Sequence, residues 1–166
     1  MRRLCLTLLC GLVAVPAALA AANATGDGVL EIKGASGTVV VTGSRGTVWG
    51  QMDSGRLVVT DPLPSDGTIF VNGAENIAPG RTDAVTIYTG RDLHFRVTGG
   101  KYKLSFKGSG IDLTAVGIGT AQLSGDVFAD ETGKFAVDSG KWSPIPPLVS
   151  RSVRFGVPPI APPTTP

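Results

Sequence analysis

The sequence predicts an all-β domain, an antiparallel sandwich or barrel of about ten short strands. Short phrases of alternating apolar and polar residues recur along the chain and end in glycine or aspartate, as in "TVVVTG", "RLVVTD" and "VTIYTG". Val, Ile, Thr, Tyr and Phe are frequent in these phrases, and such residues favour strands. Beyond the first 24 residues, no window repeats apolar residues at the 3.6-residue period of a helix.

Regular glycines mark where the strands are expected to end. Gly90, Gly99, Gly108 and Gly117 lie nine residues apart, an interval that fits one strand and one turn. In an antiparallel meander each glycine occupies a hairpin turn, whereas in a β-solenoid it occupies the corner of a coil. The glycine spacing before Gly90 looks less even, which favours the sandwich or barrel and leaves the β-solenoid as the alternative.

The N-terminal segment, "MRRLCLTLLCGLVAVPAALAAANA", predicts a cleaved signal peptide over residues 1–24. Two arginines precede a short apolar run, and small residues at A-x-A spacing follow it, with alternative cleavage sites after Ala20 and Ala24. Residues 25–155 then form a single β domain, and residues 156–166 form a proline-rich tail. No later segment has the roughly 20 apolar residues of a membrane helix, so we expect a secreted or envelope-associated protein without a transmembrane helix.

Charge and cysteine content narrow the function classes. The chain has 15 basic and 13 acidic residues, and removing the leader with Arg2 and Arg3 balances them. A balanced charge predicts no nucleic-acid partner. Because Cys5 and Cys10 both lie in the leader, the mature chain has no disulfide framework and no thiol nucleophile.

Catalytic and cofactor motifs are not found in the sequence. It has a single histidine, His94, and lacks the zinc, nucleophile-elbow and phosphate-loop signatures, so we expect no cofactor and no enzyme activity. Carboxylate pairs such as Asp53 with Asp61, or Asp130 with Glu131, leave a glycoside hydrolase as an alternative. The segment "DVFADETG" at 126–133 also holds oxygen ligands suited to calcium, but not at the spacing of a known calcium loop.

A basic hairpin is the strongest binding candidate. In "DLHFRVTGGKYKLSFKG", residues 92–108, Gly99 and Gly100 suit a type I′ turn, and the resulting register places Arg96 directly opposite Lys103. Opposed like charges cost about 0.2–1 kcal/mol, so the arrangement is explained either by solvation and a neighbouring acid or by an anionic ligand. The candidate binding residues are His94, Arg96, Lys101, Lys103 and Lys107.

Loops and aromatic residues offer further candidates. The proline- and glycine-containing stretches 61–67 and 72–84 are expected to be surface loops, where a rigid β scaffold carries binding groups. The aromatic residues are expected in the core or, if exposed, in a sugar-stacking platform. These are Trp49, Tyr88, Tyr102 and Trp142.

The leader, the glycine-punctuated strand phrases and the ending "GKFAVDSGKWSPIP" resemble small exported β-rich proteins of bacteria, particularly actinobacterial ones. The resemblance covers residues 28 to about 148 and implies a secreted β domain without assigned catalytic residues. We therefore expect a non-enzymatic exported domain with a structural or binding role at the cell envelope or outside the cell, with an anionic polymer as its candidate ligand. The alternatives are a carbohydrate-active hydrolase and a secreted protein-binding or inhibitor module.

Overall fold

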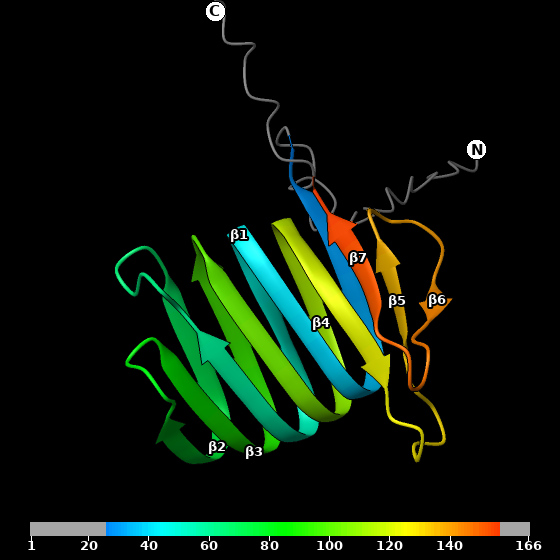
Figure 1. Ribbon diagram of the computed structural model, residues 1–166, viewed down its shortest axis with the longest axis horizontal. Helices are drawn as coiled ribbons and strands as arrows, with labels where there is room; N and C mark the ends of the chain where they lie inside the picture. Colours follow the sequence, from blue (N-terminus) through cyan, green and yellow to red (C-terminus); the bar gives the residue numbers. More distant parts are fainter. Residues whose placement is uncertain (1–25, 157–166) are drawn as a thin grey trace, which may run out of the picture.

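A computed structural model of the chain describes residues 26–156, which form β structure without a helix. The expected signal peptide and nearly all of the proline-rich tail lie outside the described residues. Within the described range, no helix is available to cross a membrane. The strands are β1 (Gly28–Thr60), β2 (Thr68–Pro79), β3 (Val85–Gly99), β4 (Tyr102–Gly125), β5 (Lys134–Val137), β6 (Ser143–Pro144) and β7 (Arg151–Phe155) (Figure 1).

The long strands form one antiparallel ribbon that winds on itself. On one side, β1 pairs with β4 and then β3, from Gly28 opposite Gly117 to Thr60 opposite Val85, with a bulge between Ile32 and Gly37. Gly117 pairs on its other side with Gly46, which lies eighteen residues after Gly28. One turn of the ribbon therefore takes eighteen residues, nine in each of two layers.

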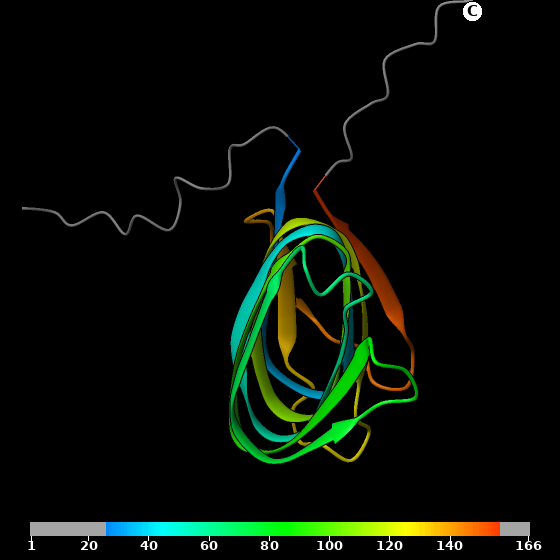
Figure 2. The ribbon, with the colours of Figure 1, turned by 90° about the vertical axis from the view of Figure 1, so that its left-hand side faces the viewer.

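The two layers are the halves of a flattened sandwich, and the end-on view in Figure 2 shows the strands bending from one half into the other. The sheet order is β2-β3-β1-β4-β7, with β5 on β1, so the sheet ends at β2 on one side and is not closed into a barrel. The first layer contains residues 28–33, 46–52, 68–72, 92–99, 111–117 and 134–137. The second contains residues 37–43, 54–60, 74–79, 85–90, 102–108, 119–125 and 151–155.

This arrangement confirms the all-β antiparallel sandwich. The chain also coils, as in the solenoid alternative, but strands adjacent in the sheet run antiparallel. The expectation of uneven spacing before Gly90 was wrong, because Gly28, Gly37, Gly46 and Gly55 are also nine residues apart. Two evenly spaced series of glycines thus face each other in the ribbon.

These glycines lie at corners between the layers rather than in hairpin turns. Gly46 pairs with Gly99 on one side and Gly117 on the other, and its φ is +134°. A Cβ atom at Gly46 would overlap the carbonyl oxygen of Val116. The corner therefore needs glycine both for backbone conformation and for the close approach of the neighbouring strand.

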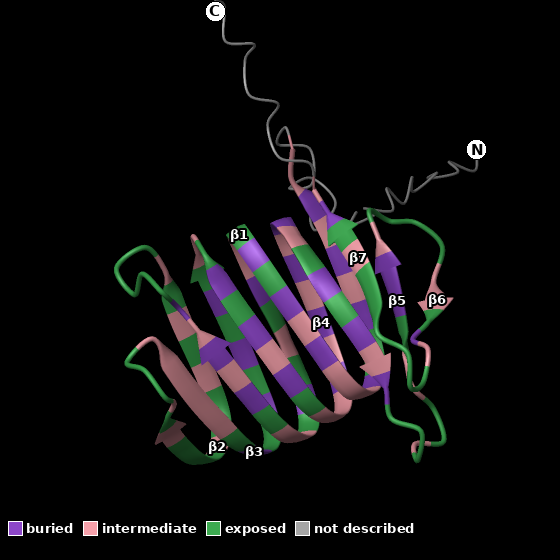
Figure 3. Ribbon diagram, in the orientation of Figure 1, coloured by how far each residue is buried: buried purple, intermediate pink, exposed green. Residues whose placement is uncertain are grey.

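The core lies between the layers, and the alternation of buried residues with more exposed ones is visible along β1 and β4 in Figure 3. Phe95 of the first layer packs on Phe106 of the second, with 4.7 Å between ring centroids. Leu57 and Leu93 are fully buried beside them in the same core. Burying each such side chain contributes roughly 1.5–3 kcal/mol, and this burial fixes which face of each strand points outward.

The predicted basic hairpin does not form. β3 and β4 are separated in the sheet by β1, so Arg96 lies opposite Trp49 and Phe70, whereas Lys103 lies opposite Thr42 and Thr60. The Gly99–Gly100 connection carries the chain from the first layer to the second. Pairing with β1 also brings apolar residues together, as in Leu93 with Met52 and Leu104 with Val41, although Phe95 lies opposite Gly50.

The loop predictions are correct in one case and wrong in the other. Residues 61–67 connect β1 to β2 without strand structure, as expected. Most of 72–84 instead belongs to β2, because Asn72–Pro79 continues the pairing with β3 around the corner. Pro79 is tolerated there because it ends an edge strand.

Candidate functional site

The outer face of the second layer over the strands of β1, β4 and β7, called the basic face here, carries four cations and no carboxylate in its three rows. Antiparallel partners point to the same side of a sheet, so the pairing register assigns its residues in three rows. The rows are Thr60, Lys103, Thr42, Thr120 and Arg154; Val58, Ser105, Val40, Gln122 and Ser152; and Arg56, Lys107, Thr38 and Ser124.

The four cations spread over this face instead of pairing with acids. Lys103 and Arg154 lie in one row, three strand spacings or about 14 Å apart. Arg56 and Lys107 lie directly opposite each other in another row. All four are exposed, and none forms an ion pair within residues 26–156, whereas Arg45 contacts Asp27 at 2.7 Å.

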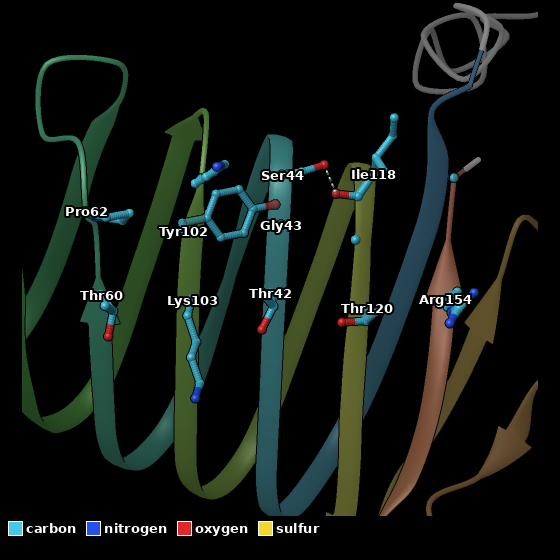
Figure 4. A pocket seen from close by; sticks show the side chains of 13 residues that line it. Thr42, Gly43, Ser44, Thr60, Pro62, Tyr102, Lys103, Ile118, Thr120 and Arg154 are labelled. Atoms are coloured by element: carbon cyan, nitrogen blue, oxygen red, sulfur yellow. Dashed lines mark hydrogen bonds between the residues drawn. The ribbon is translucent and has the colours of Figure 1, made fainter. Parts of the chain in front are cut away.

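A groove of about 580 Å³ runs along the upper part of the basic face (Figure 4). Thr42, Thr120, Lys103 and Arg154 line it from β1, β4 and β7, and Pro62 and Lys101 line it from the adjoining loops. No carboxylate lines this groove. The groove thus presents hydroxyl groups and positive charges, the donors that bind phosphate, sulfate or carboxylate groups.

Tyr102 closes the groove at the corner between the layers. In Figure 4 its ring lies across Gly43, where a Cβ atom would overlap the ring. The Tyr102 hydroxyl is buried without a hydrogen-bond partner in the described chain. Desolvation by burial raises the pKa of Tyr102 from 10.0 to about 12, so the hydroxyl stays neutral at physiological pH.

A second groove, of about 850 Å³, lies at the lower edge of the same face. Arg56 and Lys107 line it together with serine and glycine residues of the corners. Asp126 is its one carboxylate, and the Asp126 carboxylate accepts the backbone N–H of Phe128 at 3.0 Å. The cations therefore extend from the upper groove to the lower edge of the layer.

The structure separates the five predicted binding residues. Lys103 and Lys107 lie on the basic face and Lys101 lines its upper groove, whereas His94 and Arg96 lie on the outer face of the first layer. His94 contacts Asp92 at 3.2 Å. The five residues do not form one surface, because the core lies between the two groups.

Two cations of the basic face, Arg56 and Arg154, are absent from the sequence prediction. Both are distant in the sequence from the predicted hairpin at residues 92–108, and Arg154 lies in the short β7. The signal for Arg56 was present, since aligning the two nine-residue glycine series antiparallel places Gly55 beside Gly108 and thus Arg56 beside Lys107. No comparable sequence signal indicated β7.

The carboxylate pairs considered for catalysis do not form shared sites. Asp53 lies at one corner of the second layer and Asp61 follows Thr60 at the other, about 26 Å away along the strand. Asp61 is buried and its carboxylate accepts the N–H of Leu63. Asp130 and Glu131 are exposed neighbours in a loop, and residues 26–156 hold no group of three His, Cys, Asp or Glu side chains placed to bind a metal.

Comparisons with protein-family models, curated protein sequences and solved structures gave no match to this chain. Its function is therefore inferred from its own residues and their geometry.

Proposed function

We propose that the mature chain is a non-enzymatic exported domain whose basic face binds an anionic polymer at the cell envelope. The observation that carries the proposal is the set of four exposed cations, Arg56, Lys103, Lys107 and Arg154, on a sheet face without a carboxylate. The expected signal peptide over residues 1–24 and the resemblance to exported β-rich bacterial proteins support the location.

The spacing of the cations suits a chain of anions better than one small anion. Lys103 and Arg154 are about 14 Å apart, too far to hold one phosphate or carboxylate between them. A polymer with repeated charges can contact all four cations, and linked weak contacts add to a higher affinity than any single one. Threonine and serine hydroxyls between the cations supply further hydrogen bonds.

A bound polyanion also accounts for the opposed pair Arg56 and Lys107. In the free protein the repulsion between these two charges costs a fraction of a kcal/mol, because water and salt screen most of it. An anion between them removes the repulsion. The same like-charged pair that slightly destabilises the free sheet therefore strengthens the complex.

The test is retention of the mature chain, residues 25–166, on immobilised teichoic acid and on heparin across a salt series. We expect retention that weakens as salt rises and that Lys103→Glu/Arg154→Glu lowers at least tenfold in affinity, because two attractions become repulsions. Lys134→Glu/Lys141→Glu makes the same charge change on and beside β5, away from the basic face, and should keep most of the retention. Equal losses in both variants, or no retention on either polymer, would overturn the proposal.

A further inference from the structure

The opposite side of the molecule carries a further groove, called the aromatic groove here, on the outer face of the first layer. It has a volume of about 710 Å³ and crosses the strands of β1, β3 and β4 and the edge strand β2. Its side chains stand in neighbouring rows of the register. They include Phe70, Arg96, Trp49, Thr114 and Glu31 in one row, and His94, Gln51 and Asp112 in the next, with Lys33 at the end.

Two exposed aromatic rings line this groove, Phe70 at its β2 end and Trp49 at its middle. Trp49 is 42% exposed and Phe70 is 60% exposed, because both side chains point outward from the first layer and away from the core. They stand on either side of Arg96 in the same row, two strand spacings or about 10 Å apart. Large aromatic side chains on an outer sheet face, aligned across strands, are a stacking surface for a ligand.

The charges in the aromatic groove balance, unlike those of the basic face. Arg96 and Lys33 are matched in number by Glu31 and Asp112, all lining the groove. A polyanion or polycation would therefore meet repulsion along part of its length. Gln51 and Thr114 add neutral groups that can both donate and accept hydrogen bonds.

We infer that the aromatic groove binds a neutral polysaccharide chain lying across the strands. A sugar ring has an apolar face of C–H groups, which packs on an aromatic ring, and a rim of hydroxyls, which needs both donors and acceptors. Trp49 and Phe70 supply stacking positions about one disaccharide apart, while Arg96 lies between them to donate hydrogen bonds to hydroxyl oxygens. Asp112 also accepts the backbone N–H of Gly34 at 2.6 Å, which holds that side chain in place.

This groove is independent of the proposed anion-binding function. The basic face and the aromatic groove lie on opposite layers with the core between them. The basic face and the aromatic groove can therefore each bind a ligand at the same time. A domain with both sites joins a neutral polysaccharide to an anionic polymer, which is a cross-linking role in the envelope.

The experiment uses the intrinsic fluorescence of Trp49. The protein has two tryptophans, so Trp142→Phe leaves Trp49 as the only one while keeping an aromatic ring beside Lys33 and Lys134. This protein is titrated with neutral hexasaccharides of glucose, N-acetylglucosamine and mannose, in both β- and α-linked forms where they exist. We expect saturable changes in Trp49 emission with at least one of them.

Variants separate a saccharide site from a general effect. Phe70→Ala and Arg96→Ala should each weaken the affinity at least tenfold, whereas Phe128→Ala removes an exposed ring outside the groove and should leave it unchanged. Lys103→Glu/Arg154→Glu should also leave saccharide affinity unchanged, which distinguishes failure of this site from failure of the basic face. Thermal melting confirms that each variant is folded.

Two results would overturn the inference. One is the lack of a saturable emission change with every hexasaccharide at millimolar concentration. The other is a change of oligomeric state in Phe70→Ala, measured by sedimentation velocity, without a change in saccharide affinity, which would make the aromatic pair a contact between two copies of the chain.

Discussion

Arg56 and Lys107 lie directly opposite each other on neighbouring antiparallel strands, on an outer face without an acid in its rows. The sequence had suggested such an opposed pair, but between Arg96 and Lys103, which the structure places in different layers. Like charges in this position destabilise a sheet by a fraction of a kcal/mol. Stability and ligand binding are therefore expected to respond oppositely to changes at this pair.

Lys107→Glu should raise the free energy of unfolding by about 0.5 kcal/mol, because repulsion with Arg56 becomes a cross-strand ion pair. The same change should lower retention on anionic polymers. Urea unfolding measures the first effect and salt elution the second. Arg96→Glu makes an equal charge change on the first layer and should leave retention unchanged, while a Lys107→Glu protein that is both less stable and equally retained would contradict the pairing and the binding role together.

Corner glycines should differ sharply in their tolerance of a side chain. Gly46→Ala is expected to cost about 3 kcal/mol or more, because the methyl group overlaps the carbonyl oxygen of Val116 and the backbone has a φ of +134°. Gly34 has a φ of +61° but open space around its Cβ position, so Gly34→Ala should cost only about 1–2 kcal/mol. Urea denaturation of the two variants gives the comparison, and equal losses would show that close strand approach is not what selects glycine at the corner.

Tyr102 should make stability depend on alkaline pH. Its pKa is 10.0 when exposed and about 12 when folded, so the unfolded chain loses the Tyr102 proton first as pH rises. This contribution to stability is complete below pH 10 and disappears between about pH 10 and 12, a loss of roughly 2–3 kcal/mol.

Tyr102→Phe isolates that effect, because every other side chain is the same in the two proteins. At pH 7 the variant should be as stable as the parent or about 1 kcal/mol more stable, because the buried hydroxyl has no partner. Its advantage over the parent should grow as pH rises from 9 to 12, measured by urea unfolding at each pH. A constant difference between the two proteins would mean that the hydroxyl ionises equally in the folded and unfolded states.

Much of the architecture follows from local patterns in the sequence. Alternation such as Val39 and Val41 buried with Val40 between them predicts a strand with one face in the core, because successive side chains point to opposite sides. The nine-residue glycine spacing also corresponds to the width of a layer. Once β1 is known to pair with β3 and β4, the register follows from placing the glycines of the series Gly28–Gly55 opposite those of the series Gly90–Gly117.

The sequence by itself determined the strand class, the corner positions and the lack of cysteine after Cys10. It did not determine the neighbours of each strand, since Val97 finds an apolar partner either in Tyr102, as in the predicted hairpin, or in Val48 of β1. Only the tertiary structure separated Arg96 from Lys103, brought Arg154 of β7 onto the same face as Lys103, and left Trp49 exposed while burying Tyr102. The physical reason is that strand alternation specifies two faces, but the closing of one core between two layers decides which face is buried and which charges share a surface.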